Sequence, residues 1–259
     1  MLTANGATHP GRVRHVNEDA FYTDVDAGIF IVADGMGGHN AGEIASAMAI
    51  DTMRKFVVRT LSGSEFTWPF GVDPALSFHA NWLLTATKLA NRRVCRESET
   101  RDEYTGMGTT LVTALIVDHT MTYSSVGDSR IYAFRDGVLE QLTDDDSWIG
   151  TLAAGDATLD RTTLATHPMR HVLTKTIGAR EDIEILVRER PLRDGDRILL
   201  CSDGLHDPLE SGTISDVLST EPDDQRAAQR LVQAALETGG QDNITVVLIR
   251  YAAGGATRP

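Results

Sequence analysis

The chain has 259 residues, which is enough for one large domain or two small ones and for a substantial core. Hydrophobic residues make up 41% and charged residues 24%, the balance of an ordinary globular protein. A net charge of −13 and only 6% aromatic residues argue against a nucleic-acid or anionic-membrane partner. The chain starts without the apolar run of a signal peptide, and no segment approaches the roughly 18 apolar residues of a membrane span. The expected location is therefore cytoplasmic.

The first half of the chain predicts one strand and two helices. The strand covers residues 28–33, a continuous apolar run that stops at a glycine-rich turn. A helix is expected from about residue 42 to residue 59, and a second one, with an apolar stripe, from about 80 to 97. Residues 61–74 contain Gly and Pro and break the first helix. The two helices can cover one face of a sheet.

The second half predicts mostly strands. Apolar and β-branched runs separated by turn residues indicate an antiparallel meander, and the weakly periodic residues 143–180 read as an irregular surface flap. No repeat or linker divides the chain, so a single domain over residues 1–259 is the simplest interpretation. Antiparallel strands between helical segments suggest sandwiched sheets with helices outside. The strands are expected over 109–117, 120–126, 130–134, from 138, over 197–201 and over 244–250, with a helix over 225–238.

Four aspartates stand at the ends of the predicted strands. Asp34, Asp128 and Asp203 each follow an apolar run beside Gly or a tight turn, and Asp242 precedes the last strand. Carboxylates without a His or Cys cluster favour hard cations such as Mg²⁺ or Mn²⁺, and two such ions about 4 Å apart can activate a water. An aspartate beside Gly is, taken singly, most often a turn residue. The spacing alone therefore leaves both interpretations open.

The identity of the residues at these places adds to their spacing. Six segments, in order from residue 14 to residue 245, resemble the motifs of the bacterial PP2C-type (PPM family) metal-dependent protein Ser/Thr phosphatases. They are Arg14–Asp19 (RHVNED), Ala33–His39 (ADGMGGH), Gly106–Thr110 (GMGTT), Val126–Arg130 (VGDSR), Leu200–Leu205 (LCSDGL) and Gln241–Thr245 (QDNIT).

The resemblance implies an α+β fold, a four-layer αββα sandwich of two antiparallel sheets flanked by helices, with a metal cleft between the sheet edges. It implies Mn²⁺ or Mg²⁺ as cofactor, with two core ions and a weaker third. Asp34 would bridge the two core ions, and the carbonyl of Gly35 would ligate the second. Asp203 and Asp242 would complete the first site, and Asp128 would hold the third ion together with Asp203.

The resemblance also implies a mechanism, which is direct in-line attack of a water bridging the metals on phosphorus, without a phosphoenzyme. Arg14 would pair with the substrate phosphate, and Asp19 would orient metal-bound water. Met36 stands where some family members carry a histidine proposed as general acid. The general acid is therefore unassigned. His39 is nearby but reads equally well as a loop histidine, and a metal-bound water is the alternative donor.

Several segments depart from the family pattern. Residues 8–11 (THPG) replace a common Ser-Asp-x-Gly, and residues 61–74 read as an insertion whose aromatic side chains pack locally rather than form a docking surface. Within the flap, three residues near the family's T-x-D-[HD]-[ST] pattern are candidates for the third metal and for substrate gating. Three others are candidates for substrate contact, with a structural role preferred. The first three are Asp145, Asp146 and Ser147, and the others are His167, Arg170 and His171.

The leading hypothesis is a protein-serine/threonine phosphatase. Its expected partners are phosphoproteins, among them a Ser/Thr protein kinase or its targets, with no nucleic acid, no membrane and a monomeric state. One alternative is another two-metal phosphoester hydrolase, for example on nucleotides or nucleic acid, although the acidic charge opposes nucleic acid. The other is a phosphatase-like regulatory binding module, against which the full set of expected carboxylates argues.

Overall fold

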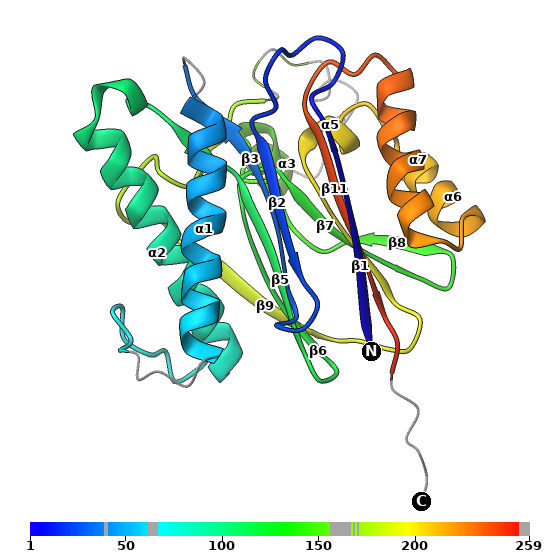
Figure 1. Ribbon diagram of the computed structural model, residues 1–259, viewed down its shortest axis with the longest axis horizontal. Coiled ribbons are helices and arrows are strands. Elements are labelled where there is room, and N and C mark those ends of the chain that lie inside the picture. The colour runs from blue at the N-terminus through cyan, green and yellow to red at the C-terminus, as the bar shows by residue number, and fades with distance from the viewer. Residues whose placement is uncertain (39–40, 62–66, 156–166, 168, 170, 254–259) are drawn as a thin grey trace, which may run out of the picture.

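The computed structural model describes residues 1–38, 41–61, 67–155, 167, 169 and 171–253. Two antiparallel β-sheets lie face to face, and helices cover their outer faces (Figure 1). The strands are β1 (Leu2–His9), β2 (Asp19–Asp24), β3 (Ile29–Met36), β4 (Gly108–Thr109), β5 (Leu111–Val117), β6 (Thr120–Val126), β7 (Arg130–Arg135), β8 (Val138–Gln141), β9 (Leu186–Pro191), β10 (Arg197–Cys201) and β11 (Ile244–Tyr251). The helices are α1 (Ala41–Leu61), α2 (Phe78–Thr100), η1 (Asp102–Tyr104), α3 (Trp148–Gly155), α5 (Asp203–His206), α6 (Ser211–Thr220) and α7 (Asp224–Glu237).

The sheets follow the orders β2–β3–β5–β6–β9, with β4 paired to β3, and β1–β11–β10–β7–β8. Alternate residues of β3 serve two cores, because successive side chains of a strand point to opposite faces. Phe30 and Val32 enter the core between the sheets, whereas Ile29 and Ile31 pack toward α1 and α2. Helices α6 and α7 cover the five-stranded sheet through a third core. The expected four-layer α+β sandwich is confirmed.

The expected meander from residue 109 to 139 is wrong in one respect. Strands β5 and β6 form a hairpin in one sheet, but β7 and β8 form a hairpin in the other. The chain changes sheets at residues 127–129, where Gly127 has φ +98. A Cβ added to Gly127 would lie only 2.7 Å from Thr110 Cγ2. Glycine permits both the conformation and the close approach. As a result, Asp128 lies at the crossing between the two sheets.

The predicted flap is more regular than expected. Residues 148–155 form helix α3, and the two ends of the flap are joined by backbone hydrogen bonds. Thr174 donates to Asp146 O at 2.7 Å, and Trp148 donates to Val172 O at 2.8 Å. Residues 156–166, 168 and 170 of the flap lie outside the described residues. The flap therefore has a defined base, which the irregular sequence pattern did not predict.

The predicted insertion packs locally where it is described. Trp68 contacts the core under α1 and α2 and meets the Phe78 ring edge-on, with centroids 5.7 Å apart. The Phe70 ring lies under the guanidinium of Arg92 at 4.8 Å and the ammonium of Lys88 at 5.5 Å. Phe66 lies outside the described residues. For Trp68 and Phe70, the expectation of local packing is confirmed.

Candidate active site

The strand ends of both sheets meet at one edge of the sandwich. Antiparallel register places Asp19 directly opposite Asp34 on β2 and β3. In the other sheet, Asp203 follows β10 and Asp242 precedes β11, and these two strands are paired. The carboxylate of Asp34 is close enough to the other four, including Asp128, to feel their charges. The structure thus brings together five of the carboxylates predicted from the sequence.

Short hydroxyl side chains join the strands beneath these carboxylates. Ser202 Oγ donates to Asp19 Oδ2 at 2.8 Å and so connects the two sheets. The backbone N–H of Asp34 donates to Thr110 Oγ1 at 3.0 Å, and the Thr110 and Ser129 hydroxyls lie 2.7 Å apart. Since Ser129 adjoins Asp128, these bonds tie the crossing segment to the end of β3. The carboxylates are therefore carried by an interconnected backbone.

The electrostatics of the cluster fit a cation site. Burial and neighbouring carboxylates raise the pKa of Asp19 and of Asp128 to about 7 each. The same two causes raise the pKa of Asp34 well above its ordinary range, and that of Asp203 as well. Asp19 Oδ1 and Asp203 Oδ1 are buried without a hydrogen-bond partner among the described residues. Buried, unsatisfied carboxylate oxygens are the ligands that hard divalent cations prefer.

Gly35 lies where the end of β3 meets the start of α1. A Cβ added to Gly35 would lie 2.1 Å from Gly42 O and 2.7 Å from Glu18 O, so only glycine fits. Its N–H donates to Glu18 O at 3.1 Å. The close approach brings the N-terminus of α1 against the carboxylates.

Arg14 lies at the rim of the cluster. Its Nη2 donates to Asp242 Oδ2 at 2.8 Å, and this hydrogen bond is the main cause of the raised pKa of Arg14. The side chain is 53% exposed, so an anion can reach the guanidinium from solvent. The predicted phosphate-binding residue and the predicted metal ligands are thus neighbours.

The candidates for the general acid remain as the sequence left them. Met36 is half-buried at the end of β3, where it pairs with Gly108. His39 lies outside the described residues.

The acidic residues at the start of the flap anchor it to the sheets. Asp145 forms a bidentate pair with Arg130, at 2.8 Å to Nε and 2.6 Å to Nη2. Asp146 exchanges hydrogen bonds with the backbone of Gly127, at 2.9 and 3.3 Å. Ser147 Oγ accepts from the N–H of Gly150 at 3.0 Å in the first turn of α3. These contacts give all three residues a structural role.

The histidines predicted on the flap have different surroundings. The His167 ring packs against that of Trp148, with centroids 4.9 Å apart, which fits the preferred structural interpretation. Arg170 lies outside the described residues. His171 Nδ1 lies 3.3 Å from Asp207 Oδ2, so this histidine connects the flap to the segment after β10.

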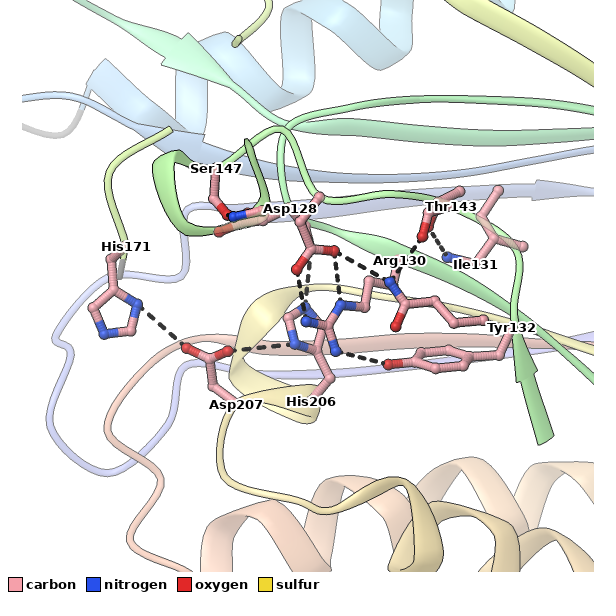
Figure 2. A network of polar contacts seen from close by, with 12 residues as sticks. Asp128, Arg130, Ile131, Tyr132, Thr143, Ser147, His171, His206 and Asp207 are labelled. Carbon is pink, nitrogen blue, oxygen red and sulfur yellow. Dashed lines mark hydrogen bonds and ion pairs between the residues drawn. The ribbon is translucent and has the colours of Figure 1, made fainter. Parts of the chain in front are cut away.

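Asp207 belongs to a polar network that the sequence analysis missed (Figure 2). Its second oxygen lies 3.4 Å from His206 Nδ1, and His206 Nε2 donates to the backbone carbonyl of Asp128 at 2.9 Å. His171, Asp203 and Asp207 offer ligand atoms that all lie within 4.8 Å of one another. The available signal was spacing, because Asp207 is four residues after Asp203 and four residues make one helical turn.

Glu18 is the second residue that the sequence analysis missed as a candidate. Burial raises its pKa, while its hydrogen bond to the Gly42 backbone and the nearby Arg14 oppose the shift. The carboxylate therefore lies between the N-terminus of α1 and the rim of the site. Glu18 was visible as part of the Arg14–Asp19 segment, but nothing in its spacing marked its side chain.

Comparisons with known proteins agree with this geometry. The family model described as protein phosphatase 2C matches residues 6–245. The serine/threonine phosphatase stp of Listeria monocytogenes serotype 4b is 32% identical over 254 residues, which cover 96% of this chain and 95% of that protein. The serine/threonine protein phosphatase PstP of Mycobacterium tuberculosis is 36% identical over 238 residues. They cover 92% of this chain but only 43% of PstP.

A solved structure shows the same relationship. The catalytic domain of PstP, in complex with two manganese ions, superposes with a TM-score of 0.81 at 33% identity. The superposition covers 97% of this chain and 98% of that one. The match spans both sheets and every predicted motif from residue 14 to residue 245. The chain belongs to the protein phosphatase 2C family.

Proposed function

We propose that this chain is a metal-dependent protein serine/threonine phosphatase that hydrolyses phosphoserine and phosphothreonine in protein substrates. The observation that carries the proposal is the convergence of aspartates from both sheets, with two buried carboxylate oxygens that have no partner among the described residues. The names of the relatives, which are serine/threonine phosphatases, give the substrate class.

The proposed cofactors are Mn²⁺ or Mg²⁺. Asp34, the carbonyl of Gly35, Asp203 and Asp242 would hold two ions, and Asp128 with Asp203 would hold a third. The two manganese ions of the PstP structure support the number of core ions. Such ions supply Lewis acidity, which lowers the pKa of water and neutralises phosphoryl oxygens.

The chain's own side chains bind and orient the reactants. The planar guanidinium of Arg14 presents two N–H groups to phosphate oxygens at the rim of the site. Asp19 is held by Ser202 through Oδ2, which leaves Oδ1 free to accept a hydrogen bond from a water and orient it. Two candidates for the donor of a proton to the leaving serine or threonine oxygen stay open, His39 and a metal-bound water. These groups suit a single displacement by water, because none of them needs to form a covalent intermediate.

The cellular setting is also a proposal. We expect a single phosphatase domain over residues 1–259, acting as a cytoplasmic monomer on phosphoproteins that include a Ser/Thr kinase or its targets. Among the described residues, no helix combines the length and the apolar character needed to cross a membrane.

A Mn²⁺-dependence assay on a phosphothreonine peptide tests the function. Asp34→Asn should reduce the metal-dependent rate by more than about 100-fold, because it removes charge at the centre of the cluster. Asp118→Asn is a matched control: Asp118 is exposed in a turn with φ 52, a conformation that asparagine adopts readily. It should retain the wild-type rate.

The alternatives predict different outcomes. A metal-replete protein that hydrolyses no phosphopeptide or p-nitrophenyl phosphate would contradict the enzyme assignment. A preference for nucleotides or oligonucleotides in a substrate panel would favour another phosphoester hydrolase. Failure to bind at least two Mn²⁺ ions in calorimetry would favour a binding module.

A further inference from the structure

We propose that Asn243 is a positioning residue for Arg14. Its buried side chain fixes the loop of residues 10–18, and the loop in turn places the guanidinium that binds the substrate phosphate. The inference rests on the proposed function, because it assigns Asn243 to the same phosphate-binding site.

The side-chain amide of Asn243 is fully engaged with this one loop. Asn243 is 4% exposed. Its Oδ1 accepts from the backbone N–H of Glu18 at 2.8 Å. Its Nδ2 donates to Pro10 O at 2.9 Å and to Val16 O at 3.0 Å. The three bonds hold the loop on both sides of Arg14.

Other residues of the loop contact the segment of residues 240–243 that contains Asn243. The N–H of Arg12 donates to Gly240 O at 2.7 Å. Gly11 approaches so closely that its position for a Cβ lies 2.3 Å from Asp242 O. Figure 1 shows the loop between β1 and β2 beside the connection from α7 to β11. The loop is thus seated on residues 240–243, and Asn243 supplies three of its hydrogen bonds.

The position of the Arg14 side chain depends on these contacts between the loop and residues 240–243. The side chain is 53% exposed, and among the described residues its guanidinium forms one hydrogen bond, to Asp242. A long exposed side chain has considerable rotamer freedom, so the position of its Cα decides which anions it can reach. Releasing the loop should therefore weaken phosphate binding even though Arg14 itself is unchanged.

Asn81 provides a matched control in another part of the chain. It is also 4% exposed and makes the same kind of clamp. Its Oδ1 accepts from Asp73 N at 2.7 Å and its Nδ2 donates to Asp73 O at 2.9 Å. It fixes the segment before α2, at the end of the molecule opposite the loop of residues 10–18 (Figure 1). Replacing Asn81 removes similar bonds but leaves the phosphate-binding loop in place.

The test compares Asn243→Ala, Asn81→Ala, Arg14→Ala and the double variant Asn243→Ala/Arg14→Ala at saturating Mn²⁺. We expect Asn243→Ala and Arg14→Ala each to raise KM for a phosphothreonine peptide, and Ki for inorganic phosphate, by roughly tenfold, with smaller effects on kcat. The double variant should resemble Arg14→Ala, because residues that act through one another are not additive. Asn81→Ala should lower Tm as Asn243→Ala does, with KM within about twofold of wild type.

Hydrogen exchange gives a readout that does not depend on turnover. Amides of residues 11–18 should exchange faster in Asn243→Ala than in wild type, whereas Mn²⁺ affinity in calorimetry should be unchanged.

Three results would overturn the inference. The first is an unchanged KM in Asn243→Ala, and the second is an additive effect in the double variant. The third is a loss of Mn²⁺ affinity in Asn243→Ala that is large enough to explain the change in KM, because the substitution would then act through the adjacent Asp242. If the wild type hydrolyses no phosphoester, the proposed function fails instead. Calorimetric binding of inorganic phosphate to the wild type and the same four variants then decides the inference by itself.

Discussion

At the scale of single residues, the contact between Gly35 and Gly42 leaves no room for a side chain. An alanine at position 35 would place its Cβ 2.1 Å from a backbone oxygen, and backbone atoms cannot move aside as a side-chain end can. We expect Gly35→Ala to lower the free energy of unfolding of the metal-free protein by about 3 kcal/mol. Urea denaturation measures this change.

Gly212→Ala is the control for that prediction. Gly212 lies in helix α6, and apart from its own helix no atom of the described residues would come within 4 Å of a Cβ added there. Alanine there should raise the free energy of unfolding by up to about 1 kcal/mol, because it favours the helix. Equal urea midpoints for Gly35→Ala and wild type would show that Gly35 and Gly42 are not in close contact.

Sequence and structure agree best on the aspartates. Asp34, Asp128, Asp203 and Asp242 could be predicted because each joins an apolar strand to a turn, and strand ends gather at sheet edges. Asp207 could not be predicted in this way. Its one signal was the four-residue spacing from Asp203, and helix α5, which starts at Asp203 and ends just before Asp207, has 4 residues and is too short to turn that spacing into a periodic pattern.

At the scale of elements, the anchoring of the flap depends on the pair between Arg130 and Asp145. The side chains are 22% and 18% exposed and the contact is bidentate. Breaking a largely buried pair leaves an uncompensated charge. We expect Asp145→Asn to lower the free energy of unfolding by about 3 kcal/mol and to increase protease cleavage between residues 148 and 175.

The neighbouring carboxylate gives a matched control. Asp144 also pairs with an arginine, Arg188, at 2.7 Å, but its side chain is 85% exposed. An exposed pair contributes about 0–1 kcal/mol, so Asp144→Asn should leave stability and protease cleavage nearly unchanged. If both variants behave alike, the pair between Arg130 and Asp145 does not anchor the flap.

Elements with strong patterns were predicted, and elements defined by tertiary pairing were not. Helices α1 and α2 and strands β5, β10 and β11 follow from apolar stripes or runs, and strand β6, with the sequence TMTYSSV, follows from its place between two turns. Strand β9 was missed because most of its residues are exposed at a sheet edge and give no apolar alternation. The change of sheet between β6 and β7 also left no signal, because the same glycine turn would suit a hairpin.

At the scale of the whole molecule, the carboxylate cluster couples folding to pH. Burial raises the pKa of Asp19 and of Asp128 to about 7, whereas in the unfolded chain both lie near 3.8. Between these values the folded protein binds more protons than the unfolded chain. Stability of the metal-free protein should therefore fall as the pH rises from about 4 to about 7 and stay low above that. Thermal unfolding in the presence of a chelator measures this trend.

Divalent cations should reverse the trend, because they bind the same oxygens as the protons. A ligand that binds only the folded state stabilises it according to its concentration relative to Kd, and protons raise the apparent Kd at low pH. Added Mn²⁺ should thus raise Tm by more at pH 8 than at pH 5. In Asp34→Asn, the rise in Tm on adding Mn²⁺ should be smaller. In chelator at pH 8 the same variant should have a higher Tm than wild type, because it removes one of the clustered charges. If the metal-free wild type is instead more stable at pH 8 than at pH 5, the buried carboxylates do not carry the repulsion that suits them to bind cations.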